Sequence, residues 1–165
     1  MSIGHYLVMS CLLVQSGQIL ADAIEGRVVG ISDGDTITVL DNSKKQHKVR
    51  FAGIDAPEKR QPFGQASKVR LSDLVFGKNV VLDCGKTDRY KREICIVMIN
   101  GQDANLAQVR AGMAWWYRKY QNEQTAQQRV AYEAAEATAA AGRVGLWRDA
   151  GPVPPWEWRK VKREN

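Results

Sequence analysis

Five short strand-like runs in the first hundred positions restrict the possible folds of this chain most strongly. Four are rich in β-branched and aliphatic residues, and the third begins on polar residues and becomes apolar near its end. Each run has the length of a strand, and turn residues bound it, as in the Ser-Asp-Gly-Asp that follows the first. Patterns with helical spacing come mostly after them. The runs are residues 24–31, 36–40, 44–51, 79–84 (NVVLDC) and 93–99 (EICIVMI).

Three segments show features of helices. In residues 65–76 the apolar positions recur at helical spacing until Gly77. Asn105 is a candidate cap for a helix through residues 106–116, and an Ala-rich helix is expected from about Thr125 to Ala141. Strands followed mainly by helices predict an α+β fold. We expect a five-stranded OB-type Greek-key barrel with about three packed helices.

The composition fits one globular domain, which we place at residues 24–150. The chain has 165 residues, of which 44% are hydrophobic and 25% charged, with a formal net charge of +6. A basic protein attracts polyanions, either nucleic acid or an anionic membrane surface. Residues 151–165 form a Pro-rich and then basic tail, expected to be extended, with Trp156 and Trp158 docked on the domain and a solvated basic end.

Residues 1–23 resemble a secretory signal peptide. A short apolar core runs from Tyr6 to Val14, and Ala21-Asp22-Ala23 gives a small-x-small cleavage pattern. The core is too short to span a bilayer as a helix. The segment departs from the usual signal-peptide pattern in one respect, since no Lys or Arg precedes the apolar core. We expect export to the periplasm or the medium. An ordinary N-terminal core segment is the alternative, and lipid attachment at Cys11 fits poorly.

The two cysteines beyond this leader, Cys84 and Cys95, lie in neighbouring strand-like runs. Two strands of a hairpin could place them opposite each other, and an oxidising compartment would let them form a disulfide. Two buried free thiols are the other interpretation.

Three polar clusters could contribute to chemistry: residues 33–36 (DGDT), 50–58 (RFAGIDAPE) and 87–92 (TDRYKR). Taken singly, the first reads as a hairpin turn and the third as a solvated hairpin tip. The second could be a helix-capping or loop device or a functional site. Together they supply hard oxygen ligands, since Asp35, Asp55 and the carbonyl of Ala56 suit Ca²⁺ or Mg²⁺ better than zinc or copper.

The same clusters also supply groups for phosphate chemistry. Arg50 and Arg92 can each bind a phosphate through two N–H groups and remain charged at any working pH. Glu58 can accept a proton from water. A metal ion, two arginines and a carboxylate base are sufficient to hydrolyse a phosphodiester.

Four blocks of the sequence, in order and spacing, resemble the staphylococcal-nuclease-like (thermonuclease) family. They are V-x-x-I-S-D-G-D-T, R-F-A-G-I-D-A-P-E, T-D-R-Y-K-R and N-L-A-Q-V-R-A-G-M-A, and the similarity runs from about Ile24 to Trp147. The resemblance implies an OB-fold nuclease that uses Ca²⁺ to hydrolyse DNA and RNA and leaves 3′-phosphate ends.

The resemblance also implies a role for each matching residue. Two arginines would contact the scissile phosphate, one glutamate would be the general base, and a basic-aromatic pair would lie near a nucleotide phosphate. The metal ligands would be two carboxylates and a main-chain carbonyl. Arg50 and Arg92 match the two arginines, and Glu58 matches the general base. Arg89 and Tyr90 match the basic-aromatic pair. Asp35, Asp55 and the carbonyl of Ala56 match the metal ligands. The loop after Glu58 is shorter than in the best-known member, and Lys91 and Glu93 stand where that member has glycines.

The stretch RFAGIDAPE raises a question of direction. Strand alternation does not put positions 50 and 55 on one face, so we expect a turn after Ile54 to redirect Asp55. Pro57 is expected to stiffen the link, so that Glu58 points at water rather than at the metal.

A non-catalytic OB-fold module that binds single-stranded nucleic acid or a peptide is the main alternative. Such a module needs aromatic platforms, which Tyr90, Trp115, Trp116 and Tyr117 could provide. We favour core packing for the two tryptophans. A zinc- or His-dependent nuclease is disfavoured because His5 and His47 are the only histidines. We expect a monomer.

Overall fold

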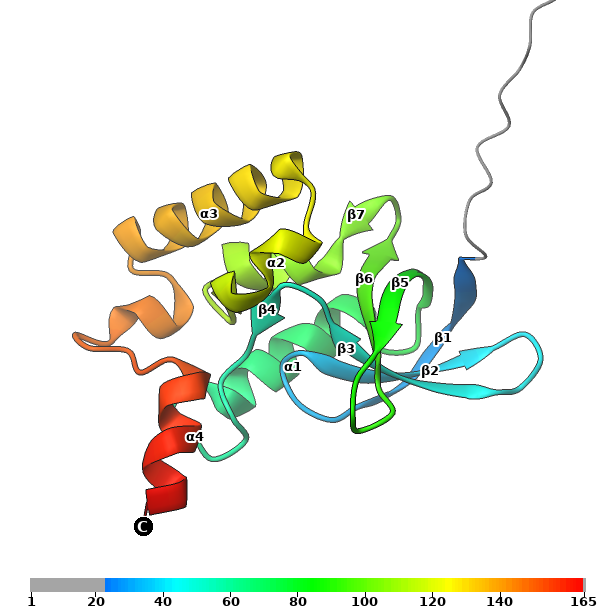
Figure 1. Cartoon of the computed structure of the whole chain (residues 1–165), viewed down its shortest axis with the longest axis horizontal. Helices are drawn as coiled ribbons and strands as arrows, with labels where there is room; N and C mark the ends of the chain where they lie inside the picture. Colours follow the sequence, from blue (N-terminus) through cyan, green and yellow to red (C-terminus); the bar gives the residue numbers. More distant parts are fainter. Residues whose placement is uncertain (1–22, 165) are drawn as a thin grey trace, which may run out of the picture.

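The computed structural model describes residues 23–164 (Figure 1). The predicted leader, apart from Ala23, lies outside these residues. The main sheet has the order β3-β2-β1-β5-β6-β7, and a two-stranded sheet pairs β4 with β8. The strands are β1 (Ile24–Ile31), β2 (Thr36–Asp41), β3 (Gln46–Phe51), β4 (Ile54–Asp55), β5 (Asn79–Thr87), β6 (Glu93–Ile99), β7 (Gln102–Asp103) and β8 (Trp115–Trp116).

A parallel pairing between β3 and β6 closes the sheet into a barrel. Arg50 on β3 is in register with Ile94 on β6, whereas the other pairs among the five long strands are antiparallel. The predicted five-stranded OB-type α+β fold is confirmed. The barrel is filled by side chains that alternate inward along each strand, such as Val28, Val39 and Val97, all fully buried.

Three helices pack against the barrel or against each other: α1 (Gly64–Val75), α2 (Ala104–Arg110) and α3 (Ala126–Ala141). Ser67, Leu71 and Val75 recur at helical spacing on α1 and are buried. Helix α3 begins with a capping box in which Thr125 and Gln128 satisfy each other's main-chain amides. The predicted helices at 65–76 and 125–141 therefore agree with α1 and α3.

The helix predicted from Asn105 through residue 116 is wrong at both ends. Asp103 is the cap, and its carboxylate accepts a hydrogen bond from the amide of Leu106. Asn105 is buried instead and links Val97, Ala52 and Cys95 by hydrogen bonds.

Gly112 explains why α2 stops early. It has a φ of 61°, and a Cβ there would come within 2.2 Å of the carbonyl oxygen of Val144. After it, Trp115 and Trp116 form β8 and are buried, as the packing interpretation predicted.

Two 3₁₀ helices, η1 (Arg118–Glu123) and η2 (Gly145–Arg148), precede the terminal helix α4 (Pro155–Glu164). The prediction of an extended tail is therefore wrong for this segment. Its prolines lie before or at the start of the helix, where a missing N–H costs nothing. Trp156 does dock, because its ring stacks on Tyr117 with centroids 5.1 Å apart.

The structure joins Cys84 and Cys95 by a disulfide across the β5–β6 ladder, where the two residues are in register. Within residues 23–164, no helix has the length and apolar character needed to cross a bilayer.

Candidate functional site

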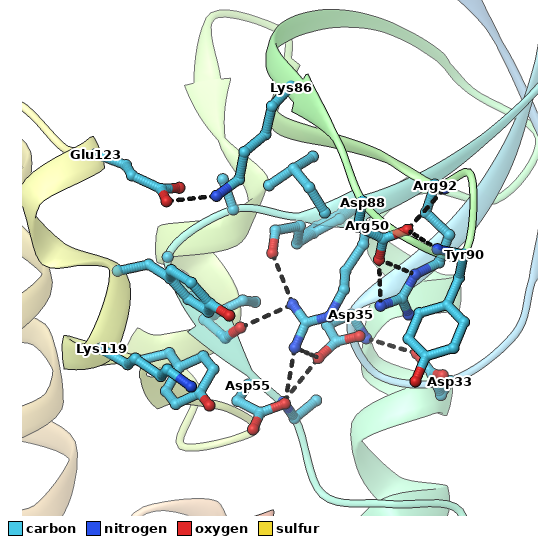
Figure 2. Close-up of a pocket in the computed structure, with 18 of the residues that line it drawn as sticks. Asp33, Asp35, Arg50, Asp55, Lys86, Asp88, Tyr90, Arg92, Lys119 and Glu123 are labelled. Carbon is cyan, nitrogen blue, oxygen red and sulfur yellow. Dashed lines mark hydrogen bonds and ion pairs between the residues drawn. The ribbon is translucent and has the colours of Figure 1, made fainter. Parts of the chain in front are cut away.

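A pocket of about 600 Å³ gathers the polar clusters of the sequence at one place. Its walls come from the β1–β2 turn, β3, β4 and the loop after it, the tip of the β5–β6 hairpin, η1 and α4. Figure 2 shows many of its side chains pointing toward one another. Every residue that the resemblance assigned to catalysis, substrate binding or metal binding lines it: Asp35, Arg50, Asp55, Ala56, Glu58, Arg89, Tyr90 and Arg92.

Asp35 and Asp55 meet at the guanidinium of Arg50 (Figure 2). The Nη2 atom of Arg50 lies 2.8 Å from Oδ1 of Asp55 and 3.3 Å from Oδ2 of Asp35. The β2–β3 register explains half of this contact, because Thr36 pairs with Arg50 and so places Asp35 beside it. Both carboxylates are nearly inaccessible, at 5% and 1% exposed.

The turn that redirects Asp55 lies earlier than expected. The chain bends at Ala52 and Gly53, where Gly53 has a φ of 70°, and Ile54 and Asp55 then form β4 against Trp116 and Trp115. The expected turn after Ile54 is therefore wrong.

Asp35 is fixed by two further hydrogen bonds. Thr36 Oγ1 donates to its Oδ1 at 2.9 Å, and the amide of Ala56 donates to its Oδ2 at 2.9 Å. Gly34 permits this close packing, since a Cβ at that position would lie 1.9 Å from the hydroxyl oxygen of Ser67. Helix α1 therefore packs directly behind the aspartate-bearing turn.

The site concentrates negative charge in a buried place. Burial, followed by the charge of Asp35, raises the pKa of Asp33 to about 6. Burial also raises the pKa of Asp55; the charge of Asp35 adds to this effect, while Arg159 and Arg50 oppose it. Two buried carboxylates repel each other, and a cation between them would stabilise their charged forms.

The donor set fits a hard divalent cation. Asp35 and Asp55 offer oxygen ligands only, and the main chain of Ala56 lies against Asp35 through its amide. Among residues 23–164 no group of three or more His, Cys, Asp or Glu side chains could hold a metal ion. A cation here would therefore complete its shell with main-chain oxygens and water, as Ca²⁺ and Mg²⁺ commonly do.

Glu58 follows the buried Pro57 and is 42% exposed in its side chain. Its Oε1 accepts a hydrogen bond from Nη1 of Arg159 at 2.7 Å. The main-chain amide of Glu58 donates to Gln61 Oε1, which holds the turn after Pro57. Glu58 is thus an accessible carboxylate next to two buried ones.

Arg92 reaches the pocket from the tip of the β5–β6 hairpin (Figure 2). Its guanidinium makes an ion pair with Asp88 at 2.8 Å and lies 5.5 Å from the ring centroid of Tyr90. Arg89 stacks on the same ring at 4.8 Å and donates a hydrogen bond to its hydroxyl. The Tyr90 side chain itself is exposed.

Further cationic and aromatic groups border the pocket on the η1 side. Lys86 is paired with Glu123 and lies over the ring of Tyr120, which also has Lys119 nearby. Tyr117 lines the pocket too. Trp115 and Trp116 are buried and do not, so they offer no stacking surface to a ligand.

Sequence reasoning gave no role to two residues that pair with the charged groups of this site, Asp88 and Arg159. Asp88 falls within the TDRYKR block, and its spacing of four from Arg92 was the available signal. Arg159 had no such signal, because it lies in a basic run that also carries Lys160 and Lys162. It reaches the site only through the packing of α4.

The comparisons with known proteins agree with this geometry. The family described as staphylococcal nuclease homologue matches residues 48–149. An uncharacterised endonuclease of Haemophilus influenzae is 47% identical over 139 residues, which cover 84% of this chain and 75% of that protein.

Two further relatives that are named as nucleases match most of the chain. A micrococcal nuclease of Shigella flexneri is 41% identical over 147 residues, which cover 84% of this chain and 82% of that protein. An uncharacterised endonuclease of Escherichia coli O157:H7 is 40% identical over 152 residues, covering 92% of this chain and 95% of that protein. The chain belongs to the staphylococcal nuclease family.

Proposed function

We propose that this protein is a calcium-dependent endonuclease that hydrolyses phosphodiester bonds in DNA and RNA and leaves 3′-phosphate ends. The observation that carries the proposal is the single pocket lined by Asp35, Asp55, Arg50, Arg92 and Glu58. A binding module would not require all of these groups in one place. Membership of a nuclease family supports the same reaction class.

Asp35 and Asp55 would hold the calcium ion, with the main-chain carbonyl of Ala56 as a third ligand. Both carboxylates are buried and repel each other, which makes their charged forms unfavourable. A bound cation would offset that cost, and this supports the assignment. A calcium ion held by these residues would supply positive charge that stabilises the phosphate oxygens.

Arg50 and Arg92 would bind the scissile phosphate in the pocket. Burial would lower the pKa of Arg50, but Asp35 and Asp55 outweigh it, so the pKa is raised and the guanidinium stays charged. Two such groups stabilise the negative charge that spreads over the phosphoryl oxygens in the transition state.

Glu58 would be the general base. It takes a proton from a water molecule as the water oxygen forms a bond to phosphorus, and the bond from phosphorus to the 5′-oxygen breaks. The 5′-oxygen leaves with a proton from solvent, and the phosphate remains on the 3′-oxygen. The exposure of Glu58, compared with that of Asp55, supports a base with access to water.

Arg89 and Tyr90 would contact the neighbouring nucleotide. The exposed ring of Tyr90 and the guanidinium stacked on it offer a flat surface and a charge beside the scissile position. The net charge of +6 favours a polyanionic substrate of either sugar type.

We further propose that residues 1–23 are a signal peptide and that the protein works as a monomer in the periplasm or the medium. Residues 24–150 would be the nuclease domain. The disulfide between Cys84 and Cys95 is compatible with an oxidising compartment. A site with few carboxylates suits the high calcium concentrations found outside cells.

Digestion of heat-denatured DNA and of RNA by the purified protein tests the proposal, in calcium and in excess chelator. We expect cleavage of both in calcium, none in chelator, and 3′-phosphates on end-group analysis. Cleavage at the full rate in chelator would contradict the calcium requirement. Binding without cleavage would favour the non-catalytic module.

A further inference from the structure

Helix α4 brings a third guanidinium to the carboxylates of the site. Arg159 Nη2 lies 2.7 Å from Asp55 Oδ2, and its Nη1 lies 2.7 Å from Glu58 Oε1 and 3.3 Å from Asp55 Oδ1. Arg159 lies outside the part of the chain that the family matches, residues 48–149. Figure 1 shows α4 beside the loop that connects β4 to α1, which carries Glu58.

Both oxygens of Asp55 are occupied by arginines. Oδ1 accepts from Arg50 at 2.8 Å, and Oδ2 accepts from Arg159 at 2.7 Å. A cation that binds Asp55 directly needs one of these oxygens. A cation beside either oxygen therefore meets the positive charge of an arginine, and the two cations compete for Asp55.

The environment of each arginine indicates which one yields. The Arg50 side chain is 15% exposed, and its Nη1 also donates to the carbonyls of Phe51 and Ile54, each at 3.0 Å. The Arg159 side chain is 34% exposed, and within residues 23–164 the hydrogen bonds found for it go to Asp55 and Glu58 only. A guanidinium held by main-chain oxygens stays in place, whereas one held by carboxylates alone is repelled by an incoming cation.

Helix α4 and the segment just before it have their own attachments to the domain. Trp156 stacks on Tyr117, and Gln61 donates a hydrogen bond to the carbonyl of Val153 at 2.6 Å. These contacts lie on the N-terminal side of Arg159. The long side chain can therefore leave Asp55 while the helix stays docked.

We propose that Arg159 is a built-in counter-ion that competes with the divalent cation for Asp55. With no cation bound, it neutralises Asp55 and holds Glu58; when a cation binds, it moves away from Asp55. Arg159 thereby weakens the cation affinity of the site. The inference rests on the cation position given under the proposed function.

Calcium titration calorimetry of the purified protein without substrate tests this competition. We expect Arg159→Gln to bind calcium about tenfold more tightly than the wild type, because a nearby positive charge is removed, although solvent partly screens it. Lys160→Gln is the matched control. It removes one charge from the same helix, where Lys160 pairs with Glu157 rather than with the site, and it should bind calcium like the wild type.

Thermal unfolding gives a second readout that does not depend on activity. In chelator, Arg159→Gln should unfold at a lower temperature than the wild type, because the buried Asp55 loses a partner. Saturating calcium should narrow that gap, since the cation takes over the role of the guanidinium. Lys160→Gln should unfold like the wild type in both conditions.

The outcomes separate the two proposals. Equal calcium affinity in the wild type and Arg159→Gln, or weaker binding in the variant, would overturn the competition and leave the calcium site intact. Absence of calcium binding to both proteins at millimolar concentrations would overturn the cation site and the competition together. Should Arg159→Gln fail to fold, Arg159→Lys serves in its place. Lysine keeps the charge but cannot make the bidentate contact, so we expect a smaller increase in calcium affinity.

Discussion

Asp88 and Arg92 hold each other at the tip of the β5–β6 hairpin. The Oδ2 atom of Asp88 accepts from Nε of Arg92 at 2.9 Å, and its Oδ1 accepts from the main-chain amide of the same residue at 3.0 Å. Burial raises the pKa of Asp88, but the hydrogen bonds from Arg92 and the amide of Tyr90 outweigh it, so the pKa is lowered and Asp88 stays ionised. The arginine is therefore oriented before a substrate arrives.

Asp88→Asn should reduce kcat/KM, because it removes the charge that orients Arg92. We expect kcat/KM to fall between about tenfold and a hundredfold. Arg92→Gln removes the guanidinium that would bind the phosphate, and it should lower kcat/KM by roughly 10²–10³. Steady-state rates on denatured DNA measure both. Asp83→Asn, on an exposed position of β5, serves as the control and should match the wild type. An Asp88→Asn protein with wild-type kinetics would show that Arg92 needs no such support.

Glu58→Gln should lower kcat by about 10²–10⁴, the usual contribution of a general base. The amide keeps an oxygen that can accept the hydrogen bond of Arg159, so circular dichroism and thermal unfolding should change little. The exposed neighbour Lys59 provides the control variant, Lys59→Gln. Full turnover by a folded Glu58→Gln protein would rule out the assigned role.

If calcium binds as proposed, Asp55→Asn should weaken that binding by about tenfold or more, because the proposed site would lose one of its few charged ligands. Calorimetric titration without substrate measures the change, with Asp83→Asn again as the control. Thermal unfolding in chelator reports whether the variant is folded. An unaltered calcium affinity would place the cation elsewhere.

His47 should make the stability of the fold depend on pH. Its Nε2 lies 2.9 Å from Asp41 Oδ2, and its Nδ1 lies 2.9 Å from Glu93 Oε2, so both nitrogens need a proton to donate. Burial lowers the pKa of His47, but the hydrogen bonds to Asp41 and Glu93 outweigh it, even with Lys45 nearby, and the net pKa is raised.

A histidine whose pKa is raised by folding contributes stability that is complete below its ordinary pKa of about 6.5 and is lost as the pH rises through the folded value. The melting temperatures of the wild type and His47→Gln should therefore differ most near pH 6 and converge as the pH rises above the folded pKa. Thermal unfolding over this range measures the gap. A gap of constant size would show that His47 acts through packing alone.

Reduction of the Cys84–Cys95 disulfide should destabilise the protein. The residues are separated by 11 positions, and a cross-link of that loop length is worth roughly 3 kcal/mol in the chain-entropy model. The melting temperature should fall in the presence of a reductant. A Cys84→Ser/Cys95→Ser double variant should already melt at the lower temperature, and the reductant should not change its melting temperature. An unchanged melting temperature of the wild type in reductant would argue against the disulfide.

The sequence was sufficient to predict the barrel because local patterns and tertiary structure agree there. Residues 24–31 alternate between the core and solvent, and β1 has those bounds. Thr125 and Gln128 form a capping box, so α3 starts where the sequence indicates. The sequence also placed Asp35, Arg50 and Arg92 among the candidates, because their types and offsets suggest one chemistry.

The rest depends on contacts that no local pattern encodes. Trp115 and Trp116 lie in an apparently helical run, yet Gly112 ends the helix because η2 packs directly against it. Arg159 resembles any other cation of a basic tail, and tertiary contacts such as the stacking of Trp156 on Tyr117 place it at the site. Residues far apart in the chain decide both outcomes.

The parallel pairing of β3 with β6 also affects the order in which the molecule is built. Each hairpin can form from neighbouring residues, but Arg50 and Arg92 face a common space only after two strands distant in sequence have been joined. Such long-range joining is slow because much chain entropy is lost before any contact compensates for it. A half-folded chain therefore contains all the reactive groups without the arrangement that makes them useful.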